Sequence, residues 1–334
     1  MSSKARGLAD LGNAFDDGAL SNRNLIINGA MQVAQRNTSV TGVTSSGYRT
    51  CDRFAVSMLT LGTWTISQST DAPEGFANSL KLDCTTADAS PAAGDYLFID
   101  QRIEGQNLQM LKKGTSNALP LTLSFWVKSS KTGDFQVNLN DIDNTRIISS
   151  VVTINATSTW EQKTITFDGD TTGTLGNDNG TSLRVEMWFD VGSNWTSGAT
   201  PTAWESLVNA DRAAGTTLAL GNSTSNELYI TGVQLELGDT ATPFEHRSYG
   251  DELARCQRYY FYEFESIYGG RYSTGSGFAG FASLPVTMRA DPTISYEAVR
   301  TTTGLTAYAS PNSAQYLMTD TSPYVQGLSA DAEL

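Results

Sequence analysis

The chain has 334 residues, of which 39% are hydrophobic and 10% aromatic, and its net charge is −13. Because acidic residues outnumber basic ones 35 to 22, the composition argues against nucleic-acid binding and against binding to an anionic membrane surface. No stretch approaches the roughly 20 apolar residues of a transmembrane helix, so membrane insertion is not expected. The length exceeds that of a usual single domain, and we expect two β-modules preceded by a leader.

The leader covers residues 1–23 and has no continuous apolar segment, so it is not a secretion signal. Leu8, Leu11 and Phe15 recur at roughly helical spacing, and Gly18 is a suitable end for a short helix. So short a helix needs a partner surface to be stable. Two interpretations stay open: an anchor that docks on a neighbouring protein through these three residues, and a frayed terminus.

Residues 24–247 have a β pattern throughout, with strand formers broken by Gly, Asn, Asp and Ser turns. Leu25, Ile26 and Ile27 predict an opening strand that stops at the turn pair Asn28-Gly29. Alternating polar and apolar residues predict that many short strands follow, without helices between them, which favours an antiparallel β-sandwich. The predicted strands include residues 53–56, 64–67, 96–103, 121–128, 135–139, 160–167, 183–189 and 228–237.

Long polar segments at residues 169–180 and 192–221 are expected to be surface loops, where binding residues often lie. The second segment contains Trp195 and Trp204, and residues 204–208 suggest a short helical turn. Exposed aromatic rings beside amides or carboxylates suit sugar binding, so these two tryptophans are candidate glycan-binding residues; core or subunit contacts are the alternative. Three further tryptophans lie within alternating strands and are expected in the core: Trp126, Trp160 and Trp188.

Residues 248–260 are predicted to form a connector helix. Asp251 and Glu252 lie in its first turn and Arg255 and Arg258 towards its end, as the helix dipole favours. Residues 261–334 again suggest short strands, at 277–284, 293–299, 305–309 and 315–318. The predicted order is therefore a sandwich, a helix and a second, small β-domain.

The sequence offers little for catalysis. Its one histidine, His246, has no nucleophile motif beside it and is expected to be a boundary or packing residue. Cys51, Cys84 and Cys256 are too scattered for a disulfide framework or a zinc site and fit buried thiols in a reducing cytosol.

Two acidic segments space oxygen ligands as calcium loops do, but neither continues into a full loop. They are Asp141-Ile-Asp143-Asn144 and Asp168-Gly-Asp170, and we expect both to be turns that bond their own backbone. No glycine loop for phosphate follows a strand. No catalytic residue, metal or cofactor is therefore predicted.

Two segments carry a resemblance to a known family. NLIINGAMQVAQR (residues 24–36) with YRTCDRF (48–54) resembles the opening of a module common in phage tail-fibre and other virion proteins, including those of cyanobacterial and marine phages. TGVQLELGDTATPFEHRSYGDELARCQRYY (231–260) resembles its closing segment. The two bracket about two-thirds of the chain, and PVTMRADPT (285–293) is similar to a piece of the small terminal β-domains that follow in such proteins.

The resemblance implies a jelly-roll sandwich and a structural protein of a bacteriophage virion, a tail-fibre, head-fibre or similar appendage subunit. It also implies a homotrimer assembled in the host cytoplasm, docked on other virion proteins through its N-terminus, and contacting a host surface glycan or only decorating the particle. The module also resembles carbohydrate-binding jelly rolls, many of which hold calcium through acidic residues of the last strand. Residues 229–233, YITGV, lack that acidic pair, which argues against calcium. The alternatives are a non-catalytic carbohydrate-binding module and, third, a glycan depolymerase.

Overall fold

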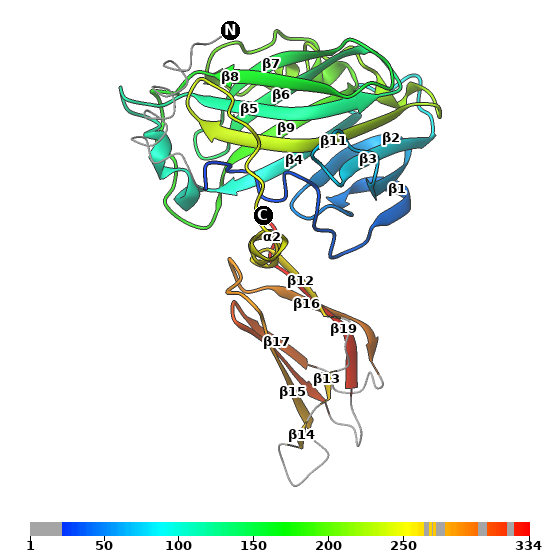
Figure 1. The fold of residues 1–334 in the computed structure, drawn as a ribbon, viewed down its shortest axis with the longest axis vertical. Coiled ribbons are helices and arrows are strands. Elements are labelled where there is room, and N and C mark those ends of the chain that lie inside the picture. Colours follow the sequence, from blue (N-terminus) through cyan, green and yellow to red (C-terminus); the bar gives the residue numbers. More distant parts are fainter. Residues whose placement is uncertain (1–21, 264–266, 269, 272–277, 300–305, 319–323) are drawn as a thin grey trace.

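The computed structural model describes residues 22–263, 267–268, 270–271, 278–299, 306–318 and 324–334. It has the predicted all-β fold: an antiparallel β-sandwich is followed by helix α2 (Tyr249–Gln257) and a smaller β unit (Figure 1). No helix in these ranges is long and apolar enough to span a membrane. The proposed anchor residues Leu8, Leu11 and Phe15 lie outside the described residues.

The sandwich consists of two layers that share the long strand β2 (Ala55–Ser69). The β9 layer has the order β10-β7-β6-β9-β4 and ends on the first half of β2, whereas the β11 layer continues from the second half of β2 through β3, β11, β5 and β8. Strand β1 also pairs with β2. The other strands are β1 (Ser39–Tyr48), β3 (Ser79–Thr86), β4 (Tyr96–Glu104), β5 (Leu121–Ser129), β6 (Gly133–Asp141), β7 (Arg146–Ile154), β8 (Glu161–Phe167), β9 (Thr181–Val191), β10 (Glu205–Ser206) and β11 (Glu227–Leu237).

Strand β2 passes from one layer to the other at a local irregularity. Ala55 to Leu59 pair with β4, and Thr63 to Ser69 pair with β3. Between them Thr60 and Gly62 have positive φ angles of 52° and 68°. A Cβ on Gly62 would lie 2.3 Å from the Thr86 carbonyl oxygen, so only glycine fits this close approach.

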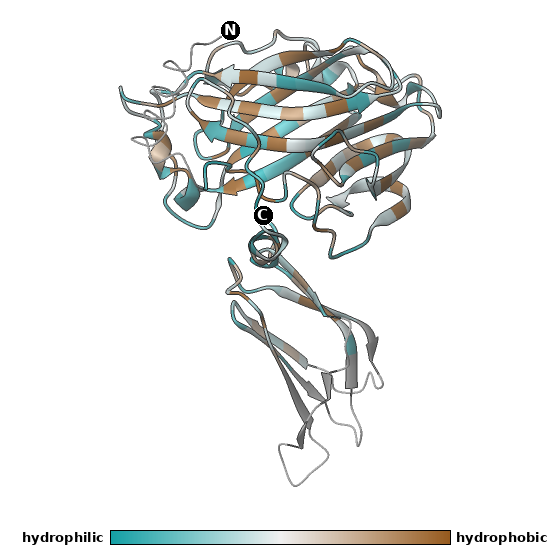
Figure 2. Ribbon diagram, in the orientation of Figure 1, coloured by the Kyte–Doolittle hydropathy of each residue, from teal (hydrophilic) through white to brown (hydrophobic). Residues whose placement is uncertain are grey.

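The core lies between the two layers and follows the strand alternation, visible as hydrophobic and hydrophilic bands along the strands (Figure 2). In β5 the residues Leu123, Phe125 and Val127 are fully buried, as their spacing predicted. They share one cluster with the inward-facing residues of β6 and β9, which are Phe135, Val137, Leu139, Leu183, Val185, Met187 and Phe189.

The C-terminal unit contains two small antiparallel sheets, ordered β12-β19-β13, with β16 also on β19, and β14-β15-β18-β17. Its core includes Phe261, Leu284, Met288 and Leu328. The predicted strands of this region are confirmed, whereas the strand β19, on which one of the sheets is built, was not predicted. The strands are β12 (Tyr260–Glu263), β13 (Ile267–Tyr268), β14 (Gly270–Arg271), β15 (Phe278–Ser283), β16 (Thr293–Val299), β17 (Thr306–Ser310), β18 (Ser313–Met318) and β19 (Tyr324–Asp331).

The two segments that carry the family resemblance lie against each other, although they are far apart in the sequence. The Leu25 amide donates to the Leu235 carbonyl at 2.8 Å, and the Val233 amide donates to the Gly29 carbonyl at 2.9 Å. The Asn28 amide donates to Glu252 of helix α2 at 2.6 Å. These segments therefore build the seam between the sandwich and the helix.

The end of the chain returns to the same seam. Arg53 is completely buried, its guanidinium lies 3.4 Å from the Tyr259 ring centroid, and it forms an ion pair with Glu333. Arg258 holds Glu104 of β4 through two bonds of 2.9 and 2.7 Å. The C-terminal unit is thus attached to the sandwich both through α2 and through the residues after β19.

Three local predictions were wrong. Residues 25–27 are not a strand, because the Ile26 and Ile27 amides donate to the side chains of Asn24 and Gln101 instead of to a neighbouring strand. Residues 204–208 contain strand β10, paired with β7, instead of a helical turn. Helix α2 ends at Gln257, and Tyr260 already begins β12.

The tryptophan predictions were also incorrect in part. Trp126 is only partly buried, because Phe125 and Val127 face the core and Trp126 must face outward. Trp160, at the start of β8, is partly buried, with its ring centroid 6.2 Å from that of Tyr229. Trp188 is fully buried, but in a cluster with Phe98 that is separate from the main core.

Candidate functional site

The outer face of the β9 layer carries polar and aromatic side chains in rows across the strands. Since Val185 and Met187 face the core, their neighbours Arg184, Glu186 and Trp188 face outward. The register aligns three rows: Phe98, Trp188 and Gln136; Asp100, Glu186 and Asn138; Arg102, Arg184 and Asn140. These nine residues are called the polar face below.

Two buried carboxylates form the centre of the polar face. Asp100 is 1% exposed and accepts two bonds of 2.9 Å from Arg184. Glu186 is completely buried and accepts bonds of 2.8 Å from both Arg212 and the Trp188 indole. Each carboxylate therefore faces a guanidinium, which is the arrangement that makes a buried charge tolerable.

The protonation of Glu186 follows from these neighbours. Burial alone would raise the pKa of this carboxyl, but the guanidiniums of Arg212 and Arg184 hold the pKa below its ordinary value. Glu186 is thus ionised at neutral pH and serves as a fixed negative charge.

Residues 193–216, called the cover loop, fold over one side of the polar face. Asn138 donates to the Arg212 carbonyl and Gln136 to the Asp211 carbonyl, both at 2.8 Å. Ala213 is completely buried against Phe98 and Trp188. Side chains of the strands Tyr96–Glu104, Gly133–Asp141 and Thr181–Val191 therefore hold the cover loop in place.

Aromatic rings line the boundary between the cover loop and the polar face. The Trp195 ring centroid lies 5.4 Å from those of both Tyr96 and Trp188, and its indole donates to the Gly94 carbonyl at 3.1 Å. Trp195 and Tyr96 are partly exposed, whereas Phe98 and Trp188 are buried. The guanidinium of Arg212 lies 5.5 Å from the Trp195 ring centroid. This edge offers ring surface beside cationic donors, the combination that suits a polar ligand with an apolar side.

The other predicted glycan-binding residue, Trp204, lies in a different setting. Its indole donates to the Asp168 carbonyl at 2.7 Å, and its ring packs partly buried against the main core. The Lys113 ammonium lies 5.3 Å from the ring centroid. A ligand role for Trp204 stays a prediction, and its contacts differ from those of Trp195.

Sequence reasoning did not find the charged centre of the polar face. The alternation of Leu183 and Val185 would have placed Arg184 and Glu186 on one outward face. Their pairing with Asp100 and Arg212 depends on strand register and on the path of the cover loop, which single-strand patterns do not contain.

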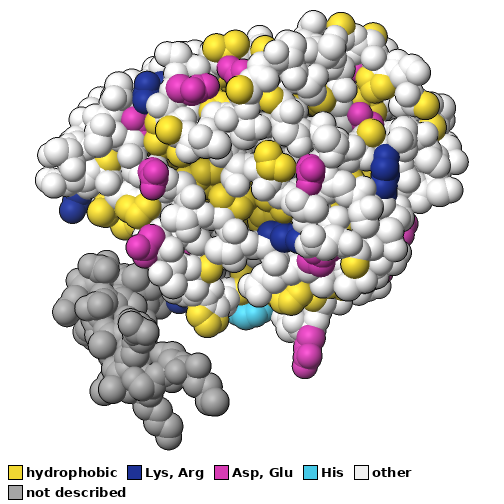
Figure 3. All heavy atoms as spheres, turned by 90° about the horizontal axis from the view of Figure 1, so that it is seen from above, with side chains coloured by type: hydrophobic (Ala, Val, Ile, Leu, Met, Phe, Trp, Pro, Cys, Tyr) yellow, Lys and Arg dark blue, Asp and Glu magenta, His cyan; other side chains and the backbone are white. Residues whose placement is uncertain are grey.

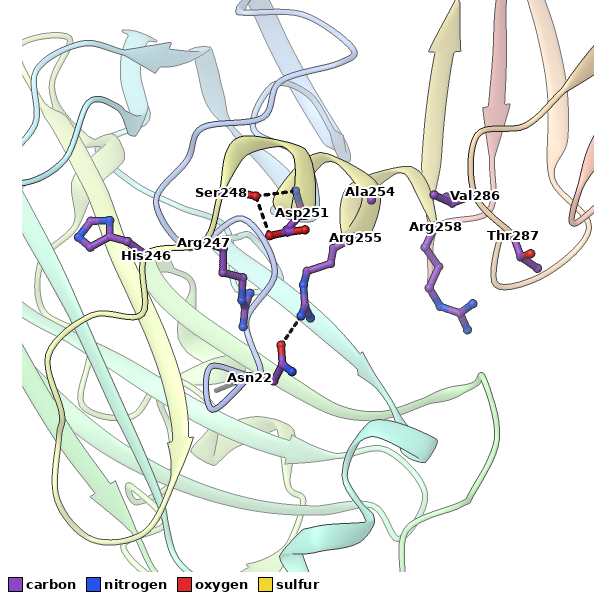
Figure 4. A pocket seen from close by; sticks show the side chains of 10 residues that line it. All are labelled: Asn22, His246, Arg247, Ser248, Asp251, Ala254, Arg255, Arg258, Val286 and Thr287. Atoms are coloured by element: carbon purple, nitrogen blue, oxygen red, sulfur yellow. Dashed lines mark hydrogen bonds between the residues drawn. The ribbon is translucent and has the colours of Figure 1, made fainter. Parts of the chain in front are cut away.

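A cavity with a volume of about 690 Å³ lies at the seam beside α2 (Figure 4). Arg247 and Arg255 point towards Asn22, and Arg255 donates to its side chain at 2.5 Å. His246 is exposed at its rim, with its ring centroid 4.9 Å from that of Phe244. Arg247 is paired with Glu245 and Glu252, and Arg258 with Glu104, so these ion pairs join separate parts of the chain around the cavity.

Among the described residues, no group of three or more His, Cys, Asp or Glu side chains is arranged to hold a metal ion. Figure 3 views the molecule from above relative to Figure 1, and the side it shows carries scattered acidic and basic side chains without a basic stripe in the part of the chain drawn in colour. The three cysteines are free and buried, as their spacing predicted.

No family model and no curated protein matches the chain. Solved structures do match the chain, at low sequence identity. The enzymatically active domain of tailspike protein 4 from bacteriophage CBA120 is 13% identical with a TM-score of 0.32, and the match covers 64% of this chain but only 21% of that chain. TmCBM61 in complex with β-1,4-galactotriose is 9% identical with a TM-score of 0.31, covering 65% of this chain and 99% of that chain. The family 11 carbohydrate-binding module of Clostridium thermocellum, in complex with a β-1,3-1,4-mixed-linked tetrasaccharide, is 11% identical with a TM-score of 0.27, covering 62% and 91%.

Proposed function

We propose that this chain recognises a glycan without cleaving it, as a structural subunit of a bacteriophage appendage. The observation that carries the glycan part is the edge where Trp195 and Tyr96 offer ring surface beside the charged polar face. A sugar ring has an apolar face that stacks on aromatic rings and hydroxyl groups that bond to guanidiniums and amides. The guanidinium of Arg212 lies 5.5 Å from the Trp195 ring centroid, and Arg184 and Arg102 are partly exposed farther along the same face.

The chemistry of the carboxyl groups supports a role without catalysis. A general acid must hold its proton near neutral pH, whereas the pKa of Glu186 is lowered. Burial raises the pKa of Asp52 and of Asp190 to about 6. Both are buried and accept backbone bonds, from Gln35 at 3.0 Å and from Gly221 at 2.7 Å, which suits a structural role.

The appendage part rests on the two segments that resemble phage virion proteins. They meet at the seam that joins the sandwich to α2 and the C-terminal unit, so the resemblance concerns how the parts are connected rather than what they bind. Homotrimer formation, contact with other virion proteins through the N-terminus and location in the virion belong to this proposal. Imaging of the source particle by cryo-EM would place the chain on a tail, on a head or off the particle.

A glycan array with fluorescently labelled protein tests the glycan proposal. Trp195→Ala and Tyr96→Ala should each weaken binding at least about tenfold, because aromatic residues at the centre of an interface commonly contribute more than 1.4 kcal/mol. Trp160→Ala, which removes a partly buried ring from the opposite layer, is the matched control and should bind like the wild type. Trp204→Ala tests the second predicted residue in the same assay.

Specific binding that persists in Trp195→Ala would contradict the assignment of this edge. Release of oligosaccharides from a bound glycan would contradict the absence of catalysis and favour a depolymerase. Native mass spectrometry at micromolar concentration tests the trimer, and a stable monomer there would count against the appendage proposal while leaving glycan binding unaffected.

A further inference from the structure

Lys113 is buried in a cage of oxygen atoms. Its ammonium lies 2.5 Å from Asp141 Oδ2 and 2.9 Å from Asp170 Oδ2. It also donates to the carbonyl oxygens of Thr172 at 2.9 Å and Gly173 at 3.0 Å. The exposed fractions of the Lys113, Asp141 and Asp170 side chains are 5%, 0% and 2%. One cation is therefore held by two carboxylates and two carbonyls away from solvent.

Three separate segments supply the cage. Lys113 follows the short 3-10 helix Gln109–Leu111, Asp141 ends β6, and Asp170 lies in the connection between β8 and β9. Neighbouring bonds fix both carboxylates: Asn144 donates its amide to Asp141 at 3.1 Å, and Arg146 donates to Asp170 at 2.7 and 3.1 Å. The ammonium thus ties three connections at one end of the sandwich.

Carboxylate and carbonyl oxygens are also the ligands that Ca²⁺ takes in proteins, at about 2.3–2.6 Å. Asp141 and Asp170 belong to the two segments whose spacing resembles calcium loops, and the structure brings one carboxylate from each onto the same cation. The lysine ammonium is a compact point charge with three donors, so it can occupy the centre of such a ligand set.

We propose that this cage is a calcium-type cation site in which the ammonium of Lys113 takes the place of the metal. Shortening Lys113 would then leave two fixed carboxylates, two carbonyls and the volume of the lost side chain, which water can fill as further ligands. In the native chain the three connections are ordered without calcium. In a shortened variant the same order depends on a divalent cation.

The test compares thermal unfolding of the full chain and of Lys113→Ala, with EDTA and with 10 mM CaCl₂. Without calcium the variant should melt roughly 10 °C lower, because Arg146 then still pairs with Asp170, whereas buried Asp141 keeps its bonds from Asn144 but loses its cation. If the site binds with a Kd of about 0.1–1 mM, calcium should recover about 5 °C of this loss, whereas the wild type shifts by less than about 1 °C. Mg²⁺ should recover less, because it is smaller and loses its water reluctantly.

Terbium gives a second readout that does not depend on stability. The Trp204 ring centroid lies 5.3 Å from the ammonium position, so a Tb³⁺ ion in the cage would be excited through this indole. Lys113→Ala should show this sensitised emission, and calcium should compete it away. Lys113→Ala/Trp204→Phe should lose the emission but keep the stabilisation by calcium.

Two controls make each outcome decisive. Lys113→Met removes the charge but fills the volume, so it should be destabilised without recovery by calcium. Lys81→Ala removes a partly exposed lysine paired with Glu227 and should show neither effect. A Lys113→Ala protein that does not respond to calcium, or that fails to fold in calcium while Lys113→Met folds, would overturn the proposal, as would a calcium or terbium response of the wild-type cage.

Discussion

Glu186→Gln tests whether the buried carboxylate holds the cover loop on the polar face. The change removes the negative charge that Arg212 contacts at 2.8 Å and Arg184 at 3.5 Å, and it places an amide hydrogen against other donors. Glu186 is completely buried, so water cannot take the place of the lost carboxylate.

The magnitude follows from this burial. Removing one partner of a buried ion pair costs about 3–5 kcal/mol. In a domain of 150–250 residues each kcal/mol lowers the melting temperature by about 2–4 °C, so a decrease of roughly 10 °C is expected. Thermal unfolding followed by tryptophan fluorescence measures it, with Glu205→Gln as the exposed control that should change little.

The pH dependence gives an independent check. The folded pKa of Glu186 is lowered, so the stability that its charge supplies is complete above the unfolded pKa of about 4.5 and is lost as the pH falls through the folded value. The difference between wild type and Glu186→Gln should therefore shrink below about pH 4.5. Equal melting temperatures for Glu186→Gln and Glu205→Gln at pH 7 would refute the reasoning.

Three further predictions concern the seam, the crossing strand and the thiols. Arg53→Met and Glu333→Gln should each cost about 3–5 kcal/mol in urea unfolding, and the double variant less than their sum; additive costs would contradict a direct pair. Gly62→Ala should cost about 1–3 kcal/mol, since φ is +68° and the Cβ would meet the Thr86 carbonyl, whereas Gly250→Ala, in open space on α2, should not destabilise. All three cysteines are buried, and burial raises the pKa of Cys51 to about 12, that of Cys256 well above its ordinary value and that of Cys84 as well. Native protein at pH 8 should therefore not react with a thiol reagent, and a reaction before unfolding would contradict this.

The sequence predicted well which residues of a strand face the core. It could not predict which side chains of other segments contact them. Leu123, Phe125 and Val127 face the core because alternation alone decides the side of a strand. The prediction for Trp126 was wrong because this alternation, and not aromatic character, decides which side of β5 it faces. Strand β19 was not predicted because Gln, Gly, Ser, Ala and Asp, which make up most of its sequence YVQGLSAD, are weak strand formers.

The functional features depended on contacts between distant segments. Asp100 and Arg184 meet only because β4 and β9 are neighbours in one particular register. Lys113 carried no signal of its own, and its partners became visible only when the connections around it were in place. Composition and spacing predicted the class of each segment, but side-chain partners require the topology.

The double attachment of the C-terminal unit has a mechanical consequence. The chain leaves the sandwich through α2 and returns to it after β19, where Glu333 reaches the buried Arg53. A domain attached through one flexible linker can rotate about that linker. A domain attached at two points resists such rotation and transmits the torque to the domain that it is attached to. A lateral force on the far end of the C-terminal unit would therefore act first on the ion pairs of Arg53 with Glu333 and of Arg258 with Glu104. As long as these pairs hold, the sandwich would rotate together with the C-terminal unit.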